Sequence, residues 1–417
     1  MQKVEIQKDL QYWKFCFYGF LKNLKFFEPF LFLFYLEMGF SYLQIGVLFS
    51  IQSVTVNLLE IPTGFVADSL GRRRSMLFSF VSYIVSFLIF YFLPYYGFYI
   101  VAVLFFALGE AFRTGTHKAM ILDYLDRQGK RDLKIHYYGH TRSWSQRGSA
   151  VSSLIAAALV FYSGSYRSVF LFTLIPYVLL LFLMISYPSY LDGTRAVNRA
   201  AQEVSFFREI FREFALVFRS ARLSRTYLTC SLGNGYFESV KNYIQPILER
   251  LGLALPILLS VTGKQRAALV TGVMYFIIYL LTSVASGASG TVSDRLGNVR
   301  RQLNGSFLAG MVLIVLIGIT YQAGWTAVAV GAFLLYYFLQ NVRRPVSLGY
   351  LSGHIKNEVM ATGLSAESQL STASVALLAP LIGWVSDRWG LGTALASVGA
   401  LGVILFPLIR IPRGEDA

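Results

Sequence analysis

Charged and amide side chains interrupt several otherwise apolar stretches of this sequence, and their types suit ligand binding or proton transfer. Three pairs of opposite charge stand three positions apart, a spacing that places both members on one face of a helix. These pairs are Lys25–Glu28, Glu110–Arg113 and Glu238–Lys241. An ionisable group at the centre of a membrane helix costs roughly 3 kcal/mol, so it usually faces a partner or a water-filled cavity. The pairs therefore fit either structural neutralisation or a functional site.

Two functional hypotheses follow from these residues. In the first, basic and amide side chains bind an anionic or zwitterionic substrate. The candidates for substrate binding are Lys22, Asn23, Lys25, Arg113, Lys241, Asn242, Gln245, Gln340 and Asn341. In the second, a buried carboxylate carries a coupling proton, because burial favours the protonated form. The candidates for proton coupling are Glu28, Glu110 and Glu238.

The sequence offers little for covalent or cofactor chemistry. It contains no HExxH, no GxSxG and no glycine-rich phosphate loop with its lysine. Four histidines are scattered along the chain, and Cys16 and Cys230 stand alone inside apolar runs. We therefore expect no catalytic residue, no metal and no cofactor, and we do not expect an enzyme.

The elements that must position these residues are apolar runs of membrane-spanning length. The 417 residues are 55% hydrophobic and only 14% charged, too few charges to cover a water-facing globule. A spanning helix needs about 20 mostly apolar residues, and twelve runs qualify. They cover about 14–37, 43–67, 75–94, 97–122, 144–162, 166–187, 226–249, 267–290, 303–321, 325–347, 365–385 and 391–411.

The distribution of lysine and arginine predicts the topology. Of 37 such residues, 27 fall in the termini and in alternate loops on one side, and five fall in the opposite loops. The positive-inside rule places both termini in the cytoplasm. The net charge of +15 is thus explained by topology, and we expect no nucleic-acid partner. The predicted domains are a six-helix bundle at 1–187, a cytoplasmic linker with an amphipathic helix at 188–225, and a second six-helix bundle at 226–417.

Two loops share a pattern of glycine and aspartate. The first reads Gly64-Phe65-Val66-Ala67-Asp68-Ser69-Leu70-Gly71-Arg72-Arg73-Arg74, and the second keeps Gly290, Asp294, Arg295 and Gly297 but has Asn298 and Val299 where the first has arginines. This pattern resembles the loop signature of the major facilitator superfamily. The resemblance extends to the number of predicted helices, to the repeated halves and to the central loop. It implies an all-α membrane protein with the fold of that family.

The resemblance also implies a gate, in which these loops hold the cytoplasmic side shut while the transporter faces outward. Glycine at position 64 would let helices approach closely, and Asp123 is a partner for Arg72 or Arg73. The gating candidates are Gly64, Asp68, Gly71, Arg72, Arg73, Asp123, Gly290, Asp294 and Gly297. A third look-alike, Gly383 to Gly390, falls on the opposite side and is interpreted as a packing element.

The resemblance implies that helices one, four, seven and ten line a central cavity, and the intramembrane charges fall on these helices. We therefore expect a secondary transporter of a small solute, coupled to protons and working as a monomer by alternating access in a bacterial inner membrane. The alternatives are a proton-coupled efflux antiporter for drugs or amphiphiles, and a non-transporting membrane sensor on the same fold. The direction of transport stays open.

Overall fold

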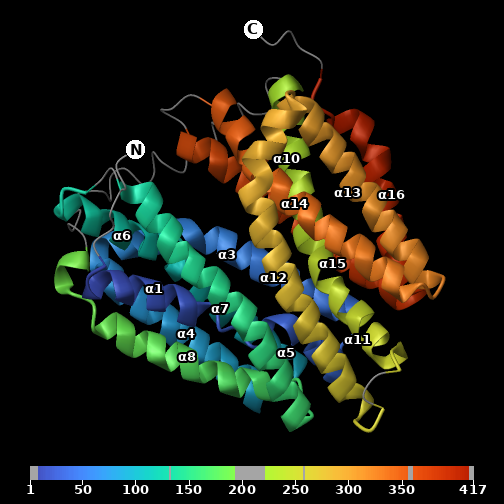
Figure 1. Ribbon diagram of the computed structural model, residues 1–417, viewed down its shortest axis with the longest axis horizontal. Coiled ribbons are helices and arrows are strands. Elements are labelled where there is room, and N and C mark those ends of the chain that lie inside the picture. Colours follow the sequence, from blue (N-terminus) through green and yellow to red (C-terminus); the bar gives the residue numbers. More distant parts are fainter. Residues whose placement is uncertain (1–7, 131–132, 193–220, 257–258, 356–359, 413–417) are drawn as a thin grey trace. The chain divides into compact units, whose positions relative to one another are not determined.

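The computed structural model of the protein describes residues 8–130, 133–192, 221–256, 259–355 and 360–412 (Figure 1). Every regular element within these ranges is helical. Most of the predicted linker, including its amphipathic helix, lies outside the described residues.

The helices follow one another with short connections. In the N-terminal part they are α1 (Leu10–Lys22), η1 (Glu28–Phe30), α2 (Leu31–Glu37), α3 (Tyr42–Leu70), α4 (Arg72–Phe92), α5 (Tyr96–Arg113), α6 (Thr116–Arg127), α7 (Lys134–Ser163), α8 (Ser168–Ile185) and η3 (Ser189–Asp192). In the C-terminal part they are α10 (Ala221–Val240), η4 (Lys241–Tyr243), α11 (Ile244–Ala254), α12 (Gly263–Leu296), α13 (Val299–Gln322), α14 (Thr326–His354), α15 (Met360–Trp389) and α16 (Leu391–Ile409).

Eight stretches of the described chain are long and apolar enough to cross a membrane, which makes this a multi-pass membrane protein. They are Tyr42–Leu70, Arg72–Phe92, Tyr96–Arg127, Ser168–Ile185, Gly263–Arg295, Val299–Gln322, Gly363–Trp389 and Leu391–Ile409. The predicted runs 14–37 and 226–249 are helical but interrupted, and α7 and α14 are helical but do not meet this criterion. The count of twelve spans and the cytoplasmic termini stay predictions.

The chain divides into two compact units. The described residues of Met1–Met38, Ile51–Val197 and Leu255–Tyr279 form unit 1. Those of Gly39–Ser50, Asn198–Ala254 and Leu280–Ala417 form unit 2. The first turns of α3 therefore group with the C-terminal helices, and the first half of α12 groups with the N-terminal helices.

Three breaks interrupt helices beside charged residues. Helix α1 ends at Lys22, and Asn23 turns back to donate a hydrogen bond from Nδ2 to the carbonyl oxygen of Gly19 at 2.7 Å. Helix α5 ends at Arg113, and Gly115 has a φ of +79°, which glycine adopts without strain. The η4 turn separates α10 from α11. Broken membrane helices expose polar backbone groups, which transporters use at their binding sites.

In unit 1, α4 packs between α5 and α8, and α1 packs on α7 and α8. The buried face of α4 carries small hydroxyl residues among its aromatics. Ser79 Oγ donates to the carbonyl oxygen of Gly109 at 2.6 Å, and Ser86 Oγ donates to that of Ala102 at 2.7 Å. A Cβ on Gly109 would lie 3.0 Å from the Ser79 carbonyl oxygen, so α4 and α5 are in close contact. Small residues and interhelical hydrogen bonds provide such contacts in membranes.

In unit 2, α13 packs on α16 and α14, and α10 packs on α15. A Cβ on Gly318 of α13 would lie 2.4 Å from the carbonyl oxygen of Gly392, which requires glycine at this crossing. The first turns of α3 pack on α15, where Asp387 accepts hydrogen bonds from the backbone N–H groups of Tyr42 at 2.8 Å and Leu43 at 2.9 Å. Asp387 is thus a packing residue, as the sequence predicts for its loop.

Candidate functional site

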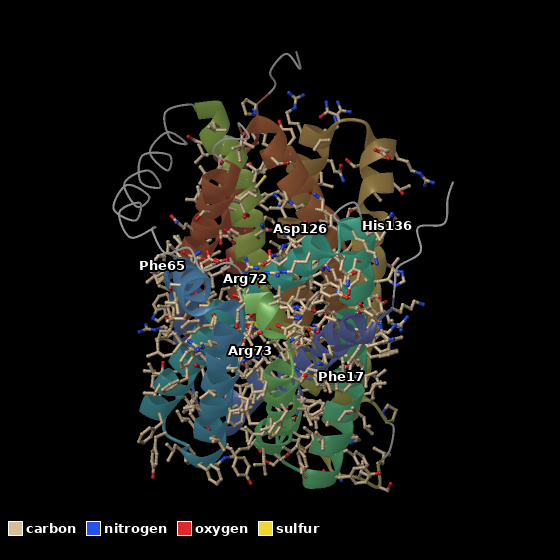
Figure 2. All side chains as sticks on the ribbon, turned by 90° about the vertical axis from the view of Figure 1, so that its left-hand side faces the viewer. Phe17, Phe65, Arg72, Arg73, Asp126 and His136 are labelled. Carbon is tan, nitrogen blue, oxygen red and sulfur yellow. The ribbon has the colours of Figure 1, made fainter. Side chains whose placement is uncertain are left out.

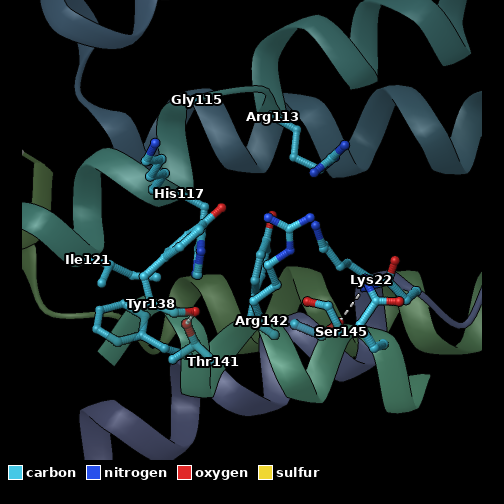
Figure 3. A pocket seen from close by; sticks show the side chains of 15 residues that line it. Lys22, Arg113, Gly115, His117, Ile121, Tyr138, Thr141, Arg142 and Ser145 are labelled. Atoms are coloured by element: carbon cyan, nitrogen blue, oxygen red, sulfur yellow. Dashed lines mark hydrogen bonds between the residues drawn. The ribbon is translucent and has the colours of Figure 1, made fainter. Parts of the chain in front are cut away.

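A cavity of about 390 Å³ in unit 1 brings together three of the predicted substrate-binding residues, Lys22, Asn23 and Arg113 (Figure 3). We call it the basic cavity. The other side chains and glycines that line it are Phe15, Tyr18, Gly19, Gly115, His117, Lys118, Ile121, Tyr138, Thr141, Arg142, Ser145 and Gln146. Four of its residues are lysine or arginine and none is a carboxylate, so the basic cavity is electrostatically suited to an anion.

Three of these four cations, Lys22, Lys118 and Arg142, form no ion pair with a carboxylate of the described chain. Figure 3 shows the ends of the Lys22 and Arg142 side chains directed toward the same space, with Arg113 on the other side of it. Lys118 lies over the ring of Tyr138, with Nζ at 5.5 Å from the ring centroid. Positive charges gathered without counter-charges favour a negatively charged ligand between them.

Arg113, in contrast, is neutralised locally. Its guanidinium is ion-paired with Glu110, which also accepts a hydrogen bond from the hydroxyl of Tyr83. Lys25 Nζ lies 3.8 Å from Glu110 Oε2, a contact that the i,i+3 spacing did not predict. Glu110 therefore interacts with two cations, Arg113 and Lys25. This arrangement fits the interpretation of a structural ion pair better than that of a proton carrier.

The N-terminus of α6 contributes to the same cavity. Gly115, its N-cap residue, and His117, in its first turn, both line the basic cavity, and no side chain caps this helix end. The free N–H groups of a helix N-terminus carry partial positive charge and favour anions. His117 is buried, its ring stacks on that of Tyr18 with centroids 3.5 Å apart, and its Nε2 lies 3.1 Å from the hydroxyl of Tyr187, so its ring is held by packing.

Arg142 and its neighbours on α7 are candidate site residues that the sequence did not identify. The positive charges around Arg142 predict a cytoplasmic loop, but α7 begins already at Lys134. Thr141, Arg142, Ser145 and Gln146 then fall on the cavity side of a helix. The signal in the sequence was this polar stripe at three- and four-residue spacing.

Unit 2 contains a second cavity of about 170 Å³, which we call the mixed cavity. Glu238 of α10 and Gln340 and Asn341 of α14, all predicted site residues, line it. The remaining lining residues are Asn234, Phe237, Arg344, Glu367, Ser368, Ser371 and Thr372. Glu238 Oε2 is 2.5 Å from Lys241 Nζ, so the third predicted pair forms as an ion pair.

The mixed cavity is not lined by the other predicted site residues of unit 2, which are Lys241, Asn242 and Gln245. Asn242 belongs to the η4 turn with Lys241, and Gln245 is fully buried in α11. Gln340 donates from Nε2 to the carbonyl oxygen of Gly233 at 3.1 Å, and Asn341 donates from Nδ2 to that of Tyr337 at 2.9 Å. In unit 1, Glu28 is exposed in the η1 turn. A role of these residues in binding stays a prediction.

Arg72, at the start of α4, contacts Asp123. The sequence predicted either Arg72 or Arg73 as the partner of this aspartate. Arg72 Nη1 lies 2.5 Å from Asp123 Oδ2. Figure 2 shows Arg72 and Arg73 at the end of α4 near α6, the helix that carries Asp123 and Asp126. Arg73 has different partners, because its Nη1 donates to the carbonyl oxygen of Tyr187 at 2.9 Å.

Asp192 is a further residue that the sequence did not identify. Its Oδ1 accepts the backbone N–H of Arg73 at 2.8 Å and so caps α4 from a segment 119 positions away. Gly71, the N-cap residue of α4, has a φ of +102°. In the second loop, α13 is capped by its own Asn298, whose Oδ1 accepts the N–H of Arg301 at 2.9 Å. The two copies therefore differ at this position because they cap the next helix differently.

The close helix approach expected at Gly64 stays a prediction. A Cβ added to Gly64 or to Gly290 would meet nothing within 4 Å. Gly64 lies on an exposed face of α3, and Gly290 and Asp294 border a cavity of about 530 Å³ beside α14. Gly297 has a φ of +66° and requires glycine for its backbone conformation.

Comparison with known proteins places the sequence in a family. The profile of the Major Facilitator Superfamily matches residues 15–366. The chain belongs to the major facilitator superfamily. It is therefore a membrane transporter and not an enzyme.

Relatives within this superfamily are distant. An uncharacterized MFS-type transporter of Bacillus subtilis (strain 168), YxaM, is 21% identical over 398 residues, which cover 94% of this chain and 92% of that protein. The multidrug resistance protein MdtG of Klebsiella pneumoniae (strain 342) is 31% identical over 195 residues, covering 44% of this chain and 42% of that protein. The crystal structure of the nucleoside transporter NupG (D323A mutant) superposes with a TM-score of 0.77 at 13% identity, covering 96% and 99% of the two chains. This last likeness shows the fold.

Proposed function

We propose that the protein is a secondary active transporter of a small organic anion, with the basic cavity as the binding site for the substrate's anionic group. The observation that carries this proposal is the placement of Lys22 and Arg142 without acidic partners in the described chain, around one polar space. Keeping two cations close together is unfavourable unless a negative charge joins them. A bound anion would supply that charge.

The size and shape of the basic cavity support a small substrate. Its volume of about 390 Å³ falls at the lower end of the range typical of small-molecule sites. Arginine offers planar paired donors that match a carboxylate or a phosphate, and Lys22 adds a point charge. Hydroxyl groups of Tyr138, Thr141 and Ser145 line the same space and suit polar substituents of the substrate.

The proposal includes the topology expected from the sequence. Twelve spans with both termini in the cytoplasm account for the segregation of lysine and arginine between alternate loops. The bacterial origin of the two relatives supports a bacterial inner membrane. Coupling to a proton and a monomeric state complete the proposal, together with alternating access, the mechanism used by transporters with such repeated halves.

Efflux of an amphiphilic drug is the second candidate function. The similarity of part of the chain to the multidrug resistance protein MdtG favours it. Many such compounds are lipophilic cations, which the basic cavity would repel. A cationic substrate would instead require the carboxylates of the mixed cavity, Glu238 and Glu367.

Thermal unfolding of the purified protein with added ligands tests the two candidates. The probes are inorganic phosphate, succinate and citrate on one side and tetraphenylphosphonium on the other, with chloride salts at equal ionic strength as reference. A ligand that binds the folded state raises the unfolding temperature. At a concentration of 100 times its Kd, it adds about 2.7 kcal/mol to the free energy of unfolding. We expect at least one organic anion to stabilise the protein.

A matched pair of variants on α7 then locates the site. Arg142→Gln removes a charge from the basic cavity, and we expect the apparent affinity for the anion to fall roughly 10–100-fold, the loss of one charge-assisted hydrogen bond. Arg147→Gln is the control, because Arg147 packs over the ring of Trp144 at 5.1 Å and does not line the cavity. Equal effects of both variants, or stabilisation by tetraphenylphosphonium alone, would contradict an anion site here.

A further inference from the structure

Glu367 is a buried carboxylate that the sequence analysis did not single out. It lies on α15 inside the membrane-spanning stretch Gly363–Trp389 and is 8% exposed. Its Oε1 accepts one hydrogen bond, from Asn234 Nδ2 of α10 at 2.6 Å. Within the described chain, no lysine or arginine forms an ion pair with it.

The three carboxylates that the sequence proposed for proton coupling are situated differently. Glu110 is held by Arg113 and Lys25, and Glu238 is held by Lys241. A neighbouring cation keeps a carboxylate ionised. Glu28 is exposed. Glu367 alone among these four combines burial with the lack of a cationic partner in the described chain.

The charged and titratable groups around Glu367 come from two helices. From α14, Arg343 and Arg344 act on it electrostatically. Arg344 lines the same mixed cavity, while Arg343 is 1% exposed and donates to the carbonyl oxygens of Thr229 at 2.5 Å and Cys230 at 3.5 Å.

From α10, Glu238 faces the mixed cavity and is ion-paired with Lys241 of η4, and the thiol of Cys230 acts electrostatically on Arg343. Tyr336 of α14 is buried near Arg343. Helix α16, which also packs on α15, contains no ionisable side chain between Leu391 and Ile409.

These surroundings can accommodate both protonation states of Glu367. A carboxylate removed from water without a cationic partner is disfavoured, and taking up a proton relieves this cost. The amide of Asn234 donates to Glu367 in either state, since a carboxylic acid keeps its carbonyl oxygen as an acceptor. Arg344 borders the same cavity and is exposed, so a movement of its side chain toward Glu367 would stabilise the ionised form.

We propose that Glu367 is the proton-binding group of the transport cycle, with Arg344 compensating its charge when the proton has left. One proton from water adds to the carboxylate oxygen and gives a neutral acid, and the same proton returns to water after the transporter has changed its conformation. This inference rests on the proposed function, because a coupling proton matters only in a transporter that uses one.

Infrared spectroscopy tests Glu367 without any knowledge of the substrate. The purified protein, in a detergent that contains no ester group, is titrated from about pH 5 to about pH 9, a range in which a desolvated carboxyl can lose its proton. We expect a carbonyl band of a protonated carboxyl at low pH that disappears as the pH rises. Glu367→Gln should remove this band, and Glu238→Gln should leave it, because Glu238 is ion-paired with Lys241.

Two further variants keep the test decisive if Glu367→Gln does not fold. Asn234→Ala deletes the one hydrogen bond to Glu367 and should shift the frequency of the band, and Glu367→Asp should retain a band with a displaced midpoint. A band that is unchanged in all three variants, or a wild-type protein without any titrating carbonyl band, would overturn the proposal. These outcomes are separate from the proposed function, whose failure would appear as the absence of anion stabilisation.

Discussion

The basic cavity of unit 1 and the mixed cavity of unit 2 are both polar, but they handle charge in different ways. The basic cavity collects lysine and arginine and leaves Lys22 and Arg142 without acidic partners in the described chain. The mixed cavity holds the carboxylates of Glu238 and Glu367, one arginine and a set of amides and hydroxyls. The two predicted halves of the protein have therefore diverged in chemistry, although their loop motifs repeat.

This difference suggests a division of labour. A cavity with excess positive charge needs a ligand to neutralise it, so it suits a substrate anion. A cavity with a lone buried carboxylate can be neutralised by a proton, so it suits a coupling ion. In both cavities a locally paired group stands next to an unpaired one, Arg113 beside Arg142 and Glu238 beside Glu367. Stability should depend on the paired groups and function on the unpaired ones.

The largest effect on stability is expected from Arg113→Gln. This change leaves Glu110 mostly buried with only Lys25, at 3.8 Å, as its cation. Breaking one partner of a buried ion pair typically costs about 3–5 kcal/mol. We therefore expect a clear fall in the free energy of unfolding, measured by thermal or denaturant unfolding in detergent without ligand.

The double variant Glu110→Gln with Arg113→Gln is the control for this prediction. It removes both charges, so it should be more stable than Arg113→Gln alone. Arg142→Gln, at an unpaired arginine of the same cavity, should leave the stability without ligand almost unchanged. If Arg113→Gln and Arg142→Gln had equal effects on stability, the distinction between paired and unpaired groups would be lost.

Part of this arrangement was predictable from the sequence. The apolar runs and the repeated loop motif identified a helical membrane transporter, and the i,i+3 spacing identified the Glu110–Arg113 and Glu238–Lys241 pairs. Spacing along one helix cannot report on partners from other helices, so the contact of Lys25 with Glu110 and the capping of α4 by Asp192 were missed. Glu367 was missed because a single glutamate between Ala366 and Ser368 has no charged partner in the local sequence to mark it.

The variant Asp387→Asn tests whether residues 39–50 are held in unit 2 by their contact with α15. The carboxylate of Asp387 accepts hydrogen bonds from the backbone N–H groups of Tyr42 and Leu43 at the N-terminus of α3. The helix dipole favours a negative charge at this end. Asparagine keeps one acceptor oxygen but loses the charge and the second acceptor, which typically costs about 1 kcal/mol. We expect the first turn of α3 to detach more often from α15.

Labelling of a single cysteine measures this detachment. Cys16 and Cys230 are replaced by alanine, and Ser41→Cys places a reporter just before α3. The rate of reaction with a water-soluble maleimide should rise about fivefold in Asp387→Asn, as expected from about 1 kcal/mol. A cysteine at the unrelated position Ser163 should react at the same rate in both backgrounds. A rate at position 41 that does not respond to Asp387→Asn would show that the cap does not hold this segment.

The smallest effect is expected at the loop copies, from the pair of Arg72 and Asp123. Their side chains are 18% and 31% exposed, so water weakens their attraction. Ion pairs of this kind typically contribute about 0.2–1 kcal/mol. A double-mutant cycle of Arg72→Gln and Asp123→Asn, followed by thermal unfolding, should give a coupling free energy in this range. The second loop copy provides the control. There Asn298, at the position that corresponds to Arg72, caps α13, and the nearby Arg295 is exposed. Arg295→Gln should change the free energy of unfolding less than Arg72→Gln does. A coupling free energy of zero between Arg72 and Asp123 would contradict the prediction. It would mean that the two loop copies differ in charge but not in the strength of an ion pair.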